Sequence, residues 1–407
     1  MHILHIYKDY HPVLGGIENH IRWLAQAQAK LGHSVTVLVT SLSRHTTVAE
    51  EDGVRVIRAA RMAHVASTPL SLSLPLLLRR ERPDVAHVHS PYPVGELSQW
   101  LLGQAKRTVL SHHSDVVRQA RILKFYAPLL RRVLSSADGI IAATPQYRDS
   151  SPFLQSHFNK CSLIPYGIDL HRFQEPDASS VAALRARHRP EGTDLPLLLF
   201  VGRLRYYKGV QYLIEAMPRI AAALMVVGTG PEGEELRSLA KAAGVSHKVH
   251  FIGEVDDTAL PSYYQAADLF VLPACERSEA FGIVMVEAMA ASRPLISTEL
   301  GTGTSFVNRH GETGLVVPPR DPGALASAIN ELLADAPRRQ AMGRAARARA
   351  EAEFSLPVMV GRVLDLYEDL LARAEGRRST NPGSGAAPAI VPRRDAAVRF
   401  GLSVQVG

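Results

Sequence analysis

Short apolar runs alternate with longer segments of helical pattern through most of this chain. The first half contains such runs at residues 2–7, 34–40, 54–59, 83–89, 106–113 and 138–143. Runs of this length are typical of parallel strands that are buried on both faces of a sheet. Because strands that alternate with helices form doubly wound α/β folds, this pattern constrains the fold class more than any other feature.

The pattern is interrupted by a polar connection near residues 165–195 and then begins again. Further strand-like runs follow at residues 195–204, 224–230, 248–255, 268–274, 293–298 and 314–319. A length of 407 residues suits two domains. We therefore expect two Rossmann-like domains, residues 1–168 and 169–375, which face each other across a cleft. The final amphipathic helix, about 357–374, is able to cross back to the first domain. Residues 376–407 are rich in Gly, Pro and Ala, and we expect a mostly disordered tail.

Composition excludes several classes of protein. No apolar run reaches the roughly 18 residues that span a bilayer, and the start MHILHIYKDY is typical of a strand, not of a signal peptide. Cys161 and Cys275 are far apart and lack metal-ligand spacing, so we expect reduced thiols in a cytosolic protein.

Charge is distributed unevenly along the chain. Residues 1–168 carry 19 Lys and Arg against 11 Asp and Glu, whereas the remainder carries 27 against 28. The basic half is either a solvated surface or a surface for an acidic ligand or an anionic membrane. No zinc finger, RNA-binding signature or basic heptad region is present, so we expect no nucleic-acid partner.

Ligands of open α/β sheets bind at the carboxyl ends of the strands, and the candidate site residues follow strands. Gly15 and Gly16 come after the first strand, where backbone N–H groups can approach a phosphate. Arg203 and Lys208 follow the first strand of the second half, and this pair of cations suits a diphosphate. Solvated surface cations are the alternative.

The stretch Ser111-His112-His113-Ser114-Asp115 ends a strand of the first half. A histidine there can contact a substrate hydroxyl or act as an acid or base, and a structural histidine is the alternative. The adjacent His112 and His113 should point to opposite faces, so they make poor joint metal ligands.

SEAFGIVMVE, residues 278–287, places one glutamate in a loop and another in the helix that follows. Gly282 permits close backbone approach at the start of that helix, whose N-terminus favours an anion. Glu279 and Glu287 can accept hydrogen bonds from two separate polyol parts of one ligand. A sugar and a ribose joined by a diphosphate fit this arrangement.

Together these motifs resemble the retaining glycosyltransferases of the GT-B fold, glycosyltransferase family four, over about residues 1–375. The resemblance rests on Glu279-x7-Glu287, on Gly202-Arg203 with Lys208-Gly209, and on Gly15-Gly16-Ile17-Glu18. Residues 164–169, IPYGID, are similar to the family's interdomain hinge. HSDVVRQ, RYYKG, RSEAFGI and ELGTGTSF resemble the mannosyltransferases that build bacterial O-antigens.

The resemblance implies a role for each candidate residue. Arg203 and Lys208 would hold the donor diphosphate, and Gly15 and Gly16 would approach it from the first domain. Glu279 would bind hydroxyls of the donor sugar, and Glu287 the nucleotide ribose. The remaining donor-binding positions of the motif would be Ala280, Phe281, Gly282 and Ile283. His113 matches the family's active-site histidine near the donor sugar, with His112 one position away.

The resemblance further implies a retaining hexosyltransferase that needs no metal, which agrees with the absence of an Asp-x-Asp motif. The expected donor is GDP-mannose or a related GDP-deoxyhexose, and no cofactor is expected. The expected acceptor is a polyprenyl-diphosphate-linked saccharide, reached from the cytoplasmic side of the membrane. The alternatives are a UDP-sugar donor, an epimerase or a synthase with a soluble acceptor, and a nucleotide-sugar-binding protein without catalysis.

Residues 116–137 carry five basic residues and no acidic one, with apolar residues at near-helical spacing. Pro128 is expected to start or kink a helix there. This segment is either a core-packed helix with a solvated basic face or an interfacial helix that docks on anionic lipid.

Overall fold

The computed structural model describes residues 1–13, 15–65, 68–114, 120–175, 177–189, 193–374 and 376. The chain forms two compact units, of which the first contains Met1–Gly167 together with the chain from Leu356 onward. The second unit is Ile168–Ser355. Helix α15 (Leu356–Ala374) therefore belongs to the first unit, whereas the domain expected from sequence ran to residue 375. The expected tail lies almost entirely outside the described residues.

The first unit is built on an eight-stranded sheet in the order β10-β9-β8-β7-β1-β2-β4-β3. Neighbouring strands of this sheet are parallel, except for the antiparallel pair β3–β4. Strands β5 and β6 form a separate antiparallel pair. The strands are β1 (His2–Ile6), β2 (Ser34–Thr40), β3 (Thr47–Glu51), β4 (Val54–Ala59), β5 (Ala63–Val65), β6 (Thr68–Leu70), β7 (Val85–Ser90), β8 (Arg107–His112), β9 (Gly139–Ala142) and β10 (Cys161–Leu163). The β1, β2, β4, β7, β8 and β9 strands coincide with the six apolar runs of the first half.

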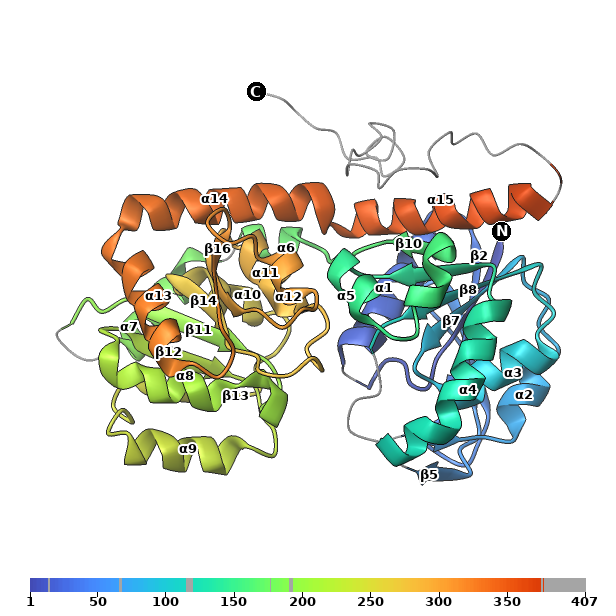
Figure 1. Cartoon of the computed structure of the whole chain (residues 1–407), viewed down its shortest axis with the longest axis horizontal. Helices are drawn as coiled ribbons and strands as arrows, with labels where there is room; N and C mark the ends of the chain where they lie inside the picture. The colour runs from blue at the N-terminus through green and yellow to red at the C-terminus, as the bar shows by residue number, and fades with distance from the viewer. Residues whose placement is uncertain are drawn as a thin grey trace. The chain divides into compact units, whose positions relative to one another are not determined.

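Two groups of helices pack on this sheet. In one group, α1 and α15 contact each other. In the other group, α3 packs against both α2 and α4 (Figure 1). The helices before the second unit are α1 (Gly16–Lys30), α2 (Ser73–Leu78), α3 (Pro93–Leu102), α4 (Ala120–Ser136), α5 (Pro145–Ser150) and the 3-10 helix η1 (Gln155–Lys160). Under α1 and α15, the core contains Ile3, Val85 and Val109 from alternate positions of neighbouring strands.

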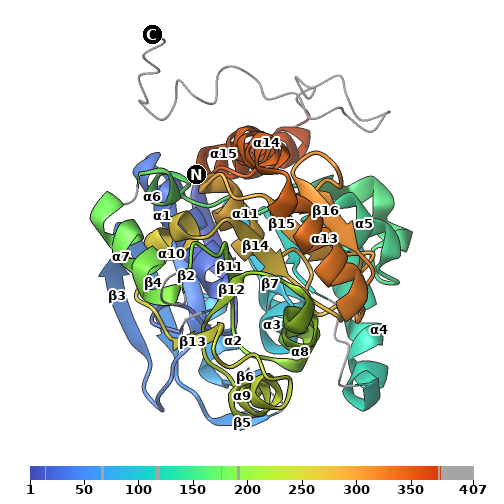
Figure 2. The ribbon, with the colours of Figure 1, turned by 90° about the vertical axis from the view of Figure 1, so that its left-hand side faces the viewer.

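The second unit is built on a six-stranded parallel sheet in the order β13-β12-β11-β14-β15-β16. Its strands are β11 (Leu197–Val201), β12 (Ala223–Val227), β13 (Val249–Gly253), β14 (Leu269–Leu272), β15 (Leu295–Thr298) and β16 (Gly314–Val317). Its helices are α6 (His171–Gln174), α7 (Ala178–His188), η2 (Tyr206–Lys208), α8 (Val210–Ala216), η3 (Met217–Arg219), α9 (Gly233–Ala242), α10 (Leu260–Ala266), α11 (Ile283–Ala290), α12 (Thr304–Val307), α13 (Pro322–Ala334) and α14 (Ala336–Glu353). Helix α8 packs with α9 and α13, and α10 packs with α6 and α7 (Figure 2).

Strand order reverses at one point in each sheet, and this point predicts where ligands bind. In the second unit it lies between β11 and β14, and in the first unit between β1 and β7. Arg203 and Lys208 follow β11, and Glu279 lies in the loop after β14. The candidate donor residues of the second unit therefore flank its switch point.

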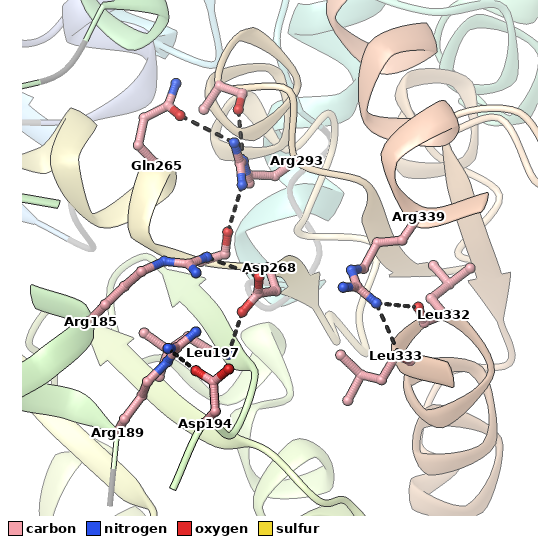
Figure 3. A network of polar contacts seen from close by, with 12 residues as sticks. Arg185, Arg189, Asp194, Leu197, Gln265, Asp268, Arg293, Leu332, Leu333 and Arg339 are labelled. Carbon is pink, nitrogen blue, oxygen red and sulfur yellow. Dashed lines mark hydrogen bonds and ion pairs between the residues drawn. The ribbon is translucent and has the colours of Figure 1, made fainter. Parts of the chain in front are cut away.

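A conspicuous charged cluster lies at the opposite end of the second sheet (Figure 3). Asp268, just before β14, accepts hydrogen bonds from the Leu197 backbone N–H and from Arg185, each at 2.9 Å. Arg293 donates to the Ala267 carbonyl at 2.9 Å. Because these contacts tie together the amino ends of β11 and β14, we assign them to the fold.

Among the described residues, no helix combines the length and the apolar character that crossing a membrane requires.

Candidate active site

Arg203 and Lys208 come from one turn after β11, but their surroundings differ. Arg203 is exposed and, within the described part of the chain, forms no ion pair. Lys208 is only 9% exposed and ends η2. The turn between them thus presents one accessible guanidinium and one buried ammonium.

The buried ammonium of Lys208 forms a short ion pair with the carboxylate of Glu279, which is itself 8% exposed. Burial lowers the pKa of Lys208, but the negative charge of Glu279 and the hydrogen bond between them more than offset it, so the net pKa shift is upward. The candidate diphosphate cation is therefore charged at neutral pH. It is also held in place by the candidate sugar-binding carboxylate.

The loop that carries Glu279 is fixed through its backbone. Thr302 Oγ1 donates to the Glu279 carbonyl at 2.8 Å, and the Gly303 N–H donates to the Ala280 carbonyl at 2.8 Å. Phe281 is buried and packs edge-on against Phe354. The ELGTGTSF segment thus supports the acidic loop after β14.

Gly282 is required at the N-cap of α11. Its φ of 81° lies in the left-handed region, and a Cβ there would lie 2.6 Å from Met285 Cε. The first N–H groups of a helix lack partners within the helix, so the N-terminus of α11 at Ile283 favours an anion.

Glu287 lies on the second turn of α11 and accepts a hydrogen bond from Tyr264 Oη at 2.5 Å. Burial raises the pKa of Glu287 to about 7, although the hydrogen bond from Tyr264 opposes this shift. Tyr264 itself is fully buried and packs against Phe173 and Phe270. A rigid aromatic side chain therefore orients the carboxylate expected to bind a ribose.

Gly209, directly after Lys208, is also required by its surroundings. Its φ is 69°, and a Cβ would lie 2.0 Å from the Pro273 carbonyl oxygen. This close approach brings the turn after β11 against the segment after β14. Gly228 plays a comparable part, since a Cβ there would lie 2.2 Å from the Gly202 carbonyl oxygen.

In the first unit, Gly15 is the N-cap of α1 and Gly16 is its first residue. Gly15 has an extended backbone with φ −177°, so its conformation does not itself require glycine. A Cβ at Gly15 would meet the Glu18 carboxylate at 2.2 Å. The pair opens the helix after β1, at the switch point of the first sheet.

His112 and His113 are both buried, but their rings have different neighbours. The ring of His112 lies near Tyr147 and Phe153. The ring of His113 is hydrogen-bonded through both nitrogens, to His89 Nδ1 at 2.9 Å and to Tyr166 Oη at 2.5 Å. These different surroundings agree with the expectation that the two are poor joint ligands.

A cavity of about 250 Å³ opens within the first unit at the carboxyl ends of β1 and β2. Its lining is rich in hydroxyl groups and carries charge of both signs. The lining residues include Asp9, Tyr10, Thr40, Ser41, Ser43 and Arg58. This composition suits a polyhydroxylated ligand.

Helix α4 begins at Ala120, so Pro128 lies inside the helix and does not start it. Tyr126, Leu130, Val133 and Leu134 are buried in the core. Arg131 and Arg132 are exposed, whereas Arg118 and the side chains of residues 121–125 lie outside the described part. The described half of this segment is therefore a core-packed helix with a basic outer face.

Comparison with known proteins identifies the class. Residues 185–349 match the family of glycosyl transferases group 1, and residues 14–172 match Glycosyltransferase Family 4. The chain is 39% identical over 358 residues to D-rhamnosyltransferase WbpZ of Pseudomonas aeruginosa, covering 87% of this chain and 92% of that protein. It is 38% identical over 375 residues to O-antigen chain mannosyltransferase C of Escherichia coli, covering 91% and 99%.

Among solved structures, a sucrose-phosphate synthase from Thermosynechococcus elongatus matches with a TM-score of 0.75 and 27% identity. The match covers 91% of this chain and 99% of that one. The two doubly wound units are thus those of a GT-B glycosyltransferase, as the sequence predicted. The chain belongs to glycosyltransferase family 4.

Sequence reasoning missed several parts of the candidate site. Tyr264, Thr302 and the hydroxyl-rich cavity carry no motif of their own, since their roles depend on contacts between distant segments. The partners of His113 were also missed, although His87 and His89 share one face of a strand by their spacing.

Proposed function

We propose that this glycosyltransferase transfers a hexose with retention of configuration and without a metal ion. Its donor is GDP-mannose, and its acceptor is a lipid-linked saccharide of O-antigen or polysaccharide biosynthesis. Arg203 and Lys208 bind the diphosphate, Glu279 binds sugar hydroxyls, and Glu287 binds the ribose. Gly15 and Gly16 approach the donor phosphate from the first unit, and His113 lies near the donor sugar.

The observation that carries this proposal is the buried pair of Lys208 and Glu279 beside the exposed Arg203. A diphosphate leaving group gains negative charge as its bond to the sugar breaks, and fixed cations stabilise that charge. The N-terminus of α11 adds a partial positive charge on the same side of the sheet. Residues Ala280–Ile283 would contribute backbone groups to the sugar and phosphate.

The choice of donor rests on the relatives. One is named a mannosyltransferase of O-antigen chains, and another a D-rhamnosyltransferase. GDP-mannose, or a GDP-deoxyhexose, therefore ranks above a UDP-sugar. Thermal unfolding in the presence of GDP-mannose, GDP-rhamnose and UDP-glucose tests this order. Protection by UDP-glucose alone would contradict it.

Retention follows in this proposal from front-face attack, in which the leaving phosphate accepts the proton of the acceptor hydroxyl. Glu279 is not assigned as a nucleophile, because Lys208 holds it in an ion pair. The cations after β11 take the place that a divalent ion occupies in other transferases. Transfer should therefore persist in EDTA. Loss of transfer in EDTA with recovery in magnesium or manganese would refute this.

The acceptor saccharide would bind in the hydroxyl-rich cavity of the first unit. Ser43→Phe or Thr47→Phe should fill it, raising KM for the acceptor and leaving donor binding unchanged. An unchanged KM in both variants would place the acceptor elsewhere.

A lipid-linked acceptor requires attachment to the membrane, and we propose that the first unit docks on anionic lipid from the cytoplasm. Four apolar side chains on the packed helices α2 and α3, or directly before α2, are exposed by 39% or more: Leu72, Leu76, Trp100 and Leu101. Arg131 and Arg132 are exposed on α4, which packs next to α3. Apolar side chains beside basic ones suit an anionic bilayer interface.

Co-sedimentation with vesicles of phosphatidylglycerol and phosphatidylcholine tests the docking. Binding should fall at high salt, in Arg131→Gln/Arg132→Gln and in Trp100→Ser. The same charge removal at Arg338 and Arg347 of the second unit is a matched control. Equal binding by all variants would remove the proposed surface.

Two alternatives remain distinguishable by the products formed. An epimerase or a synthase with a soluble acceptor would convert GDP-mannose without any lipid-linked saccharide. A protein that only binds nucleotide sugars would be protected thermally by the donor and form no product.

A further inference from the structure

Five histidines are buried side by side in the first unit, and the proposed function uses only His113. His5 lies on β1, His87 and His89 lie on β7, and His20 lies on α1, each at most 6% exposed. His5 and His87 are register partners on neighbouring strands. Since side chains alternate along a strand, His89 shares their face of the sheet.

Three of these rings form one chain of hydrogen bonds with a polar group at each end. His5 Nε2 lies 2.8 Å from Gln28 Oε1, and His5 Nδ1 lies 3.1 Å from His89 Nε2. His89 Nδ1 lies 2.9 Å from His113 Nε2, and His113 Nδ1 lies 2.5 Å from Tyr166 Oη. The chain of hydrogen bonds therefore starts on helix α1 and passes through β1, β7 and the residue after β8. It ends at Tyr166, next to the end of the Met1–Gly167 part of this unit.

The chain links the protonation of distant groups. Burial lowers the pKa of His5 to about 4 and lowers those of His89 and His113 well below the ordinary value, so the three rings are neutral at pH 7. A neutral imidazole has one donor and one acceptor nitrogen. The direction of the hydrogen bond at one end therefore sets the tautomer of every ring. With Gln28 Oε1 accepting, all three rings carry the proton on Nε2, and Tyr166 donates to His113 Nδ1.

A metal centre is the competing explanation, because the histidines form two groups of three whose ligand atoms lie within 4.8 Å of one another. The separations along the chain are hydrogen-bond lengths, however, and each nitrogen in it already has a partner. An ion bound between two of these nitrogens would need to displace a shared proton. The geometry thus favours a hydrogen-bonded chain.

We propose that Gln28, His5 and His89 are positioning residues that fix the tautomer and ring orientation of His113. This rests on the proposed role of His113 near the donor sugar. The chain of hydrogen bonds keeps His113 uncharged, with both of its ring nitrogens hydrogen-bonded. His113 therefore contributes shape and a fixed dipole and does not gain a proton. Any ring contact to a sugar hydroxyl would be at Nδ1, in place of Tyr166.

The test is the ¹⁵N NMR of imidazole nitrogens in full-length protein labelled on histidine, at pH 7.5. Single His→Asn variants assign the signals. In the wild type, His5, His89 and His113 should share one tautomer. In Gln28→Glu, the new carboxylate still accepts from His5 Nε2–H but stabilises the imidazolium, so His5 should take up a second proton from water at Nδ1. His5 Nδ1–H then donates to His89 Nε2, and His89 and His113 change to the Nδ1–H tautomer.

The protein offers two matched controls. Gln26→Glu makes the same change on the same helix, but Gln26 contacts Asp52 at the surface and should leave the tautomers unaltered. His87 bonds to Ser111 and Tyr367 outside the chain and should keep its tautomer in every variant. Mixed tautomers in the wild type, or an unaltered His113 in Gln28→Glu, would overturn the proposal. So would a stoichiometric metal whose removal by EDTA shifts these signals.

Kinetics separate this proposal from the proposed function. A histidine held in the wrong tautomer loses activity, so Gln28→Glu should lower kcat about tenfold or more, while its affinity for free GDP stays within about twofold. A fall in kcat with unaltered tautomers would indicate a merely structural effect and refute positioning. If no donor supports transfer in the wild type, the proposed function fails. The NMR result still tests whether the hydrogen-bonded chain sets the tautomer of His113.

Discussion

Mild acid should destabilise the first unit, because that unit buries neutral histidines. Burial lowers the pKa of His5 to about 4, and burial together with repulsion from His5 lowers the pKa of His20 to about 3. The unfolded chain takes up these protons near pH 6.5, whereas the folded unit does not. Folding stability is therefore complete above about pH 6.5 and falls as the pH falls toward 4.

The magnitude follows from the two pKa values. At pH 5, each of His5 and His20 costs about 2 kcal/mol relative to pH 8, or about 4 kcal/mol together. His87, His89 and His113 act in the same direction, since burial also lowers the pKa of each. Domains are typically stable by about 5–15 kcal/mol, so this loss is a large part of the total.

Tryptophan fluorescence reports on the first unit alone, because the two tryptophans of the chain, Trp23 and Trp100, both lie there. Urea unfolding followed by this signal at pH 8, 6 and 5 gives the free energy of unfolding at each pH. His20→Gln should reduce the loss at pH 5 by about 2 kcal/mol. His45→Asn removes an exposed histidine of the same unit and should not reduce it. A loss at pH 5 that is as large in His20→Gln as in the wild type would refute the neutral cluster.

Three further predictions concern the donor site. Arg203→Ala and Lys208→Ala should each lower kcat/KM through the loss of a charge-assisted contact worth about 1.5–3 kcal/mol, and wild-type kinetics in both would remove the diphosphate assignment. Glu287→Gln should weaken binding of free GDP, whereas Glu279→Gln should weaken recognition of the sugar; calorimetry that shows an equal loss of GDP affinity in both would contradict this division. Because burial raises the pKa of Glu287 to about 7, GDP binding should strengthen as the pH rises through 7, when the carboxylate becomes the better acceptor. Tyr264→Phe removes the hydrogen bond that opposes this pKa shift and should move the transition to higher pH; an unmoved transition would exclude Glu287 as its source.

The sequence predicted the fold well because both sheets are mostly buried and parallel. All twelve apolar runs became strands, since short runs dominated by apolar residues fit the interior of such sheets. The short strands β3, β5 and β6 were not expected. β3 is largely exposed and pairs antiparallel at a sheet edge, where burial imposes no continuous apolar run. The sequence allowed α15 to pack on either unit. It could not decide between them, because an amphipathic pattern does not specify which core the helix covers.

The candidate site was predictable where one segment supplies the geometry. Gly282 and Gly209 take left-handed conformations at turns next to functional side chains, and both belong to local motifs. The Lys208–Glu279 pair was not predictable, since 71 residues separate its members. Each was predicted to bind a ligand, and the structure shows that they bind each other. Tyr264 supports Glu287 from another helix for the same reason.

The histidine chain shows how a polar pattern can be overlooked inside an apolar run. His5, His87 and His89 lie on strands whose other residues are mostly Ile, Leu, Val and Ala, so the average hydropathy of each strand hides them. A buried polar group without a partner costs about 1–3 kcal/mol, so three such rings on one face could not be left unpaired. Register solves the problem by placing His5 opposite His87 and His89 within reach of both His5 and His113. Histidines that share one face of two neighbouring buried strands therefore predict a shared hydrogen-bond network.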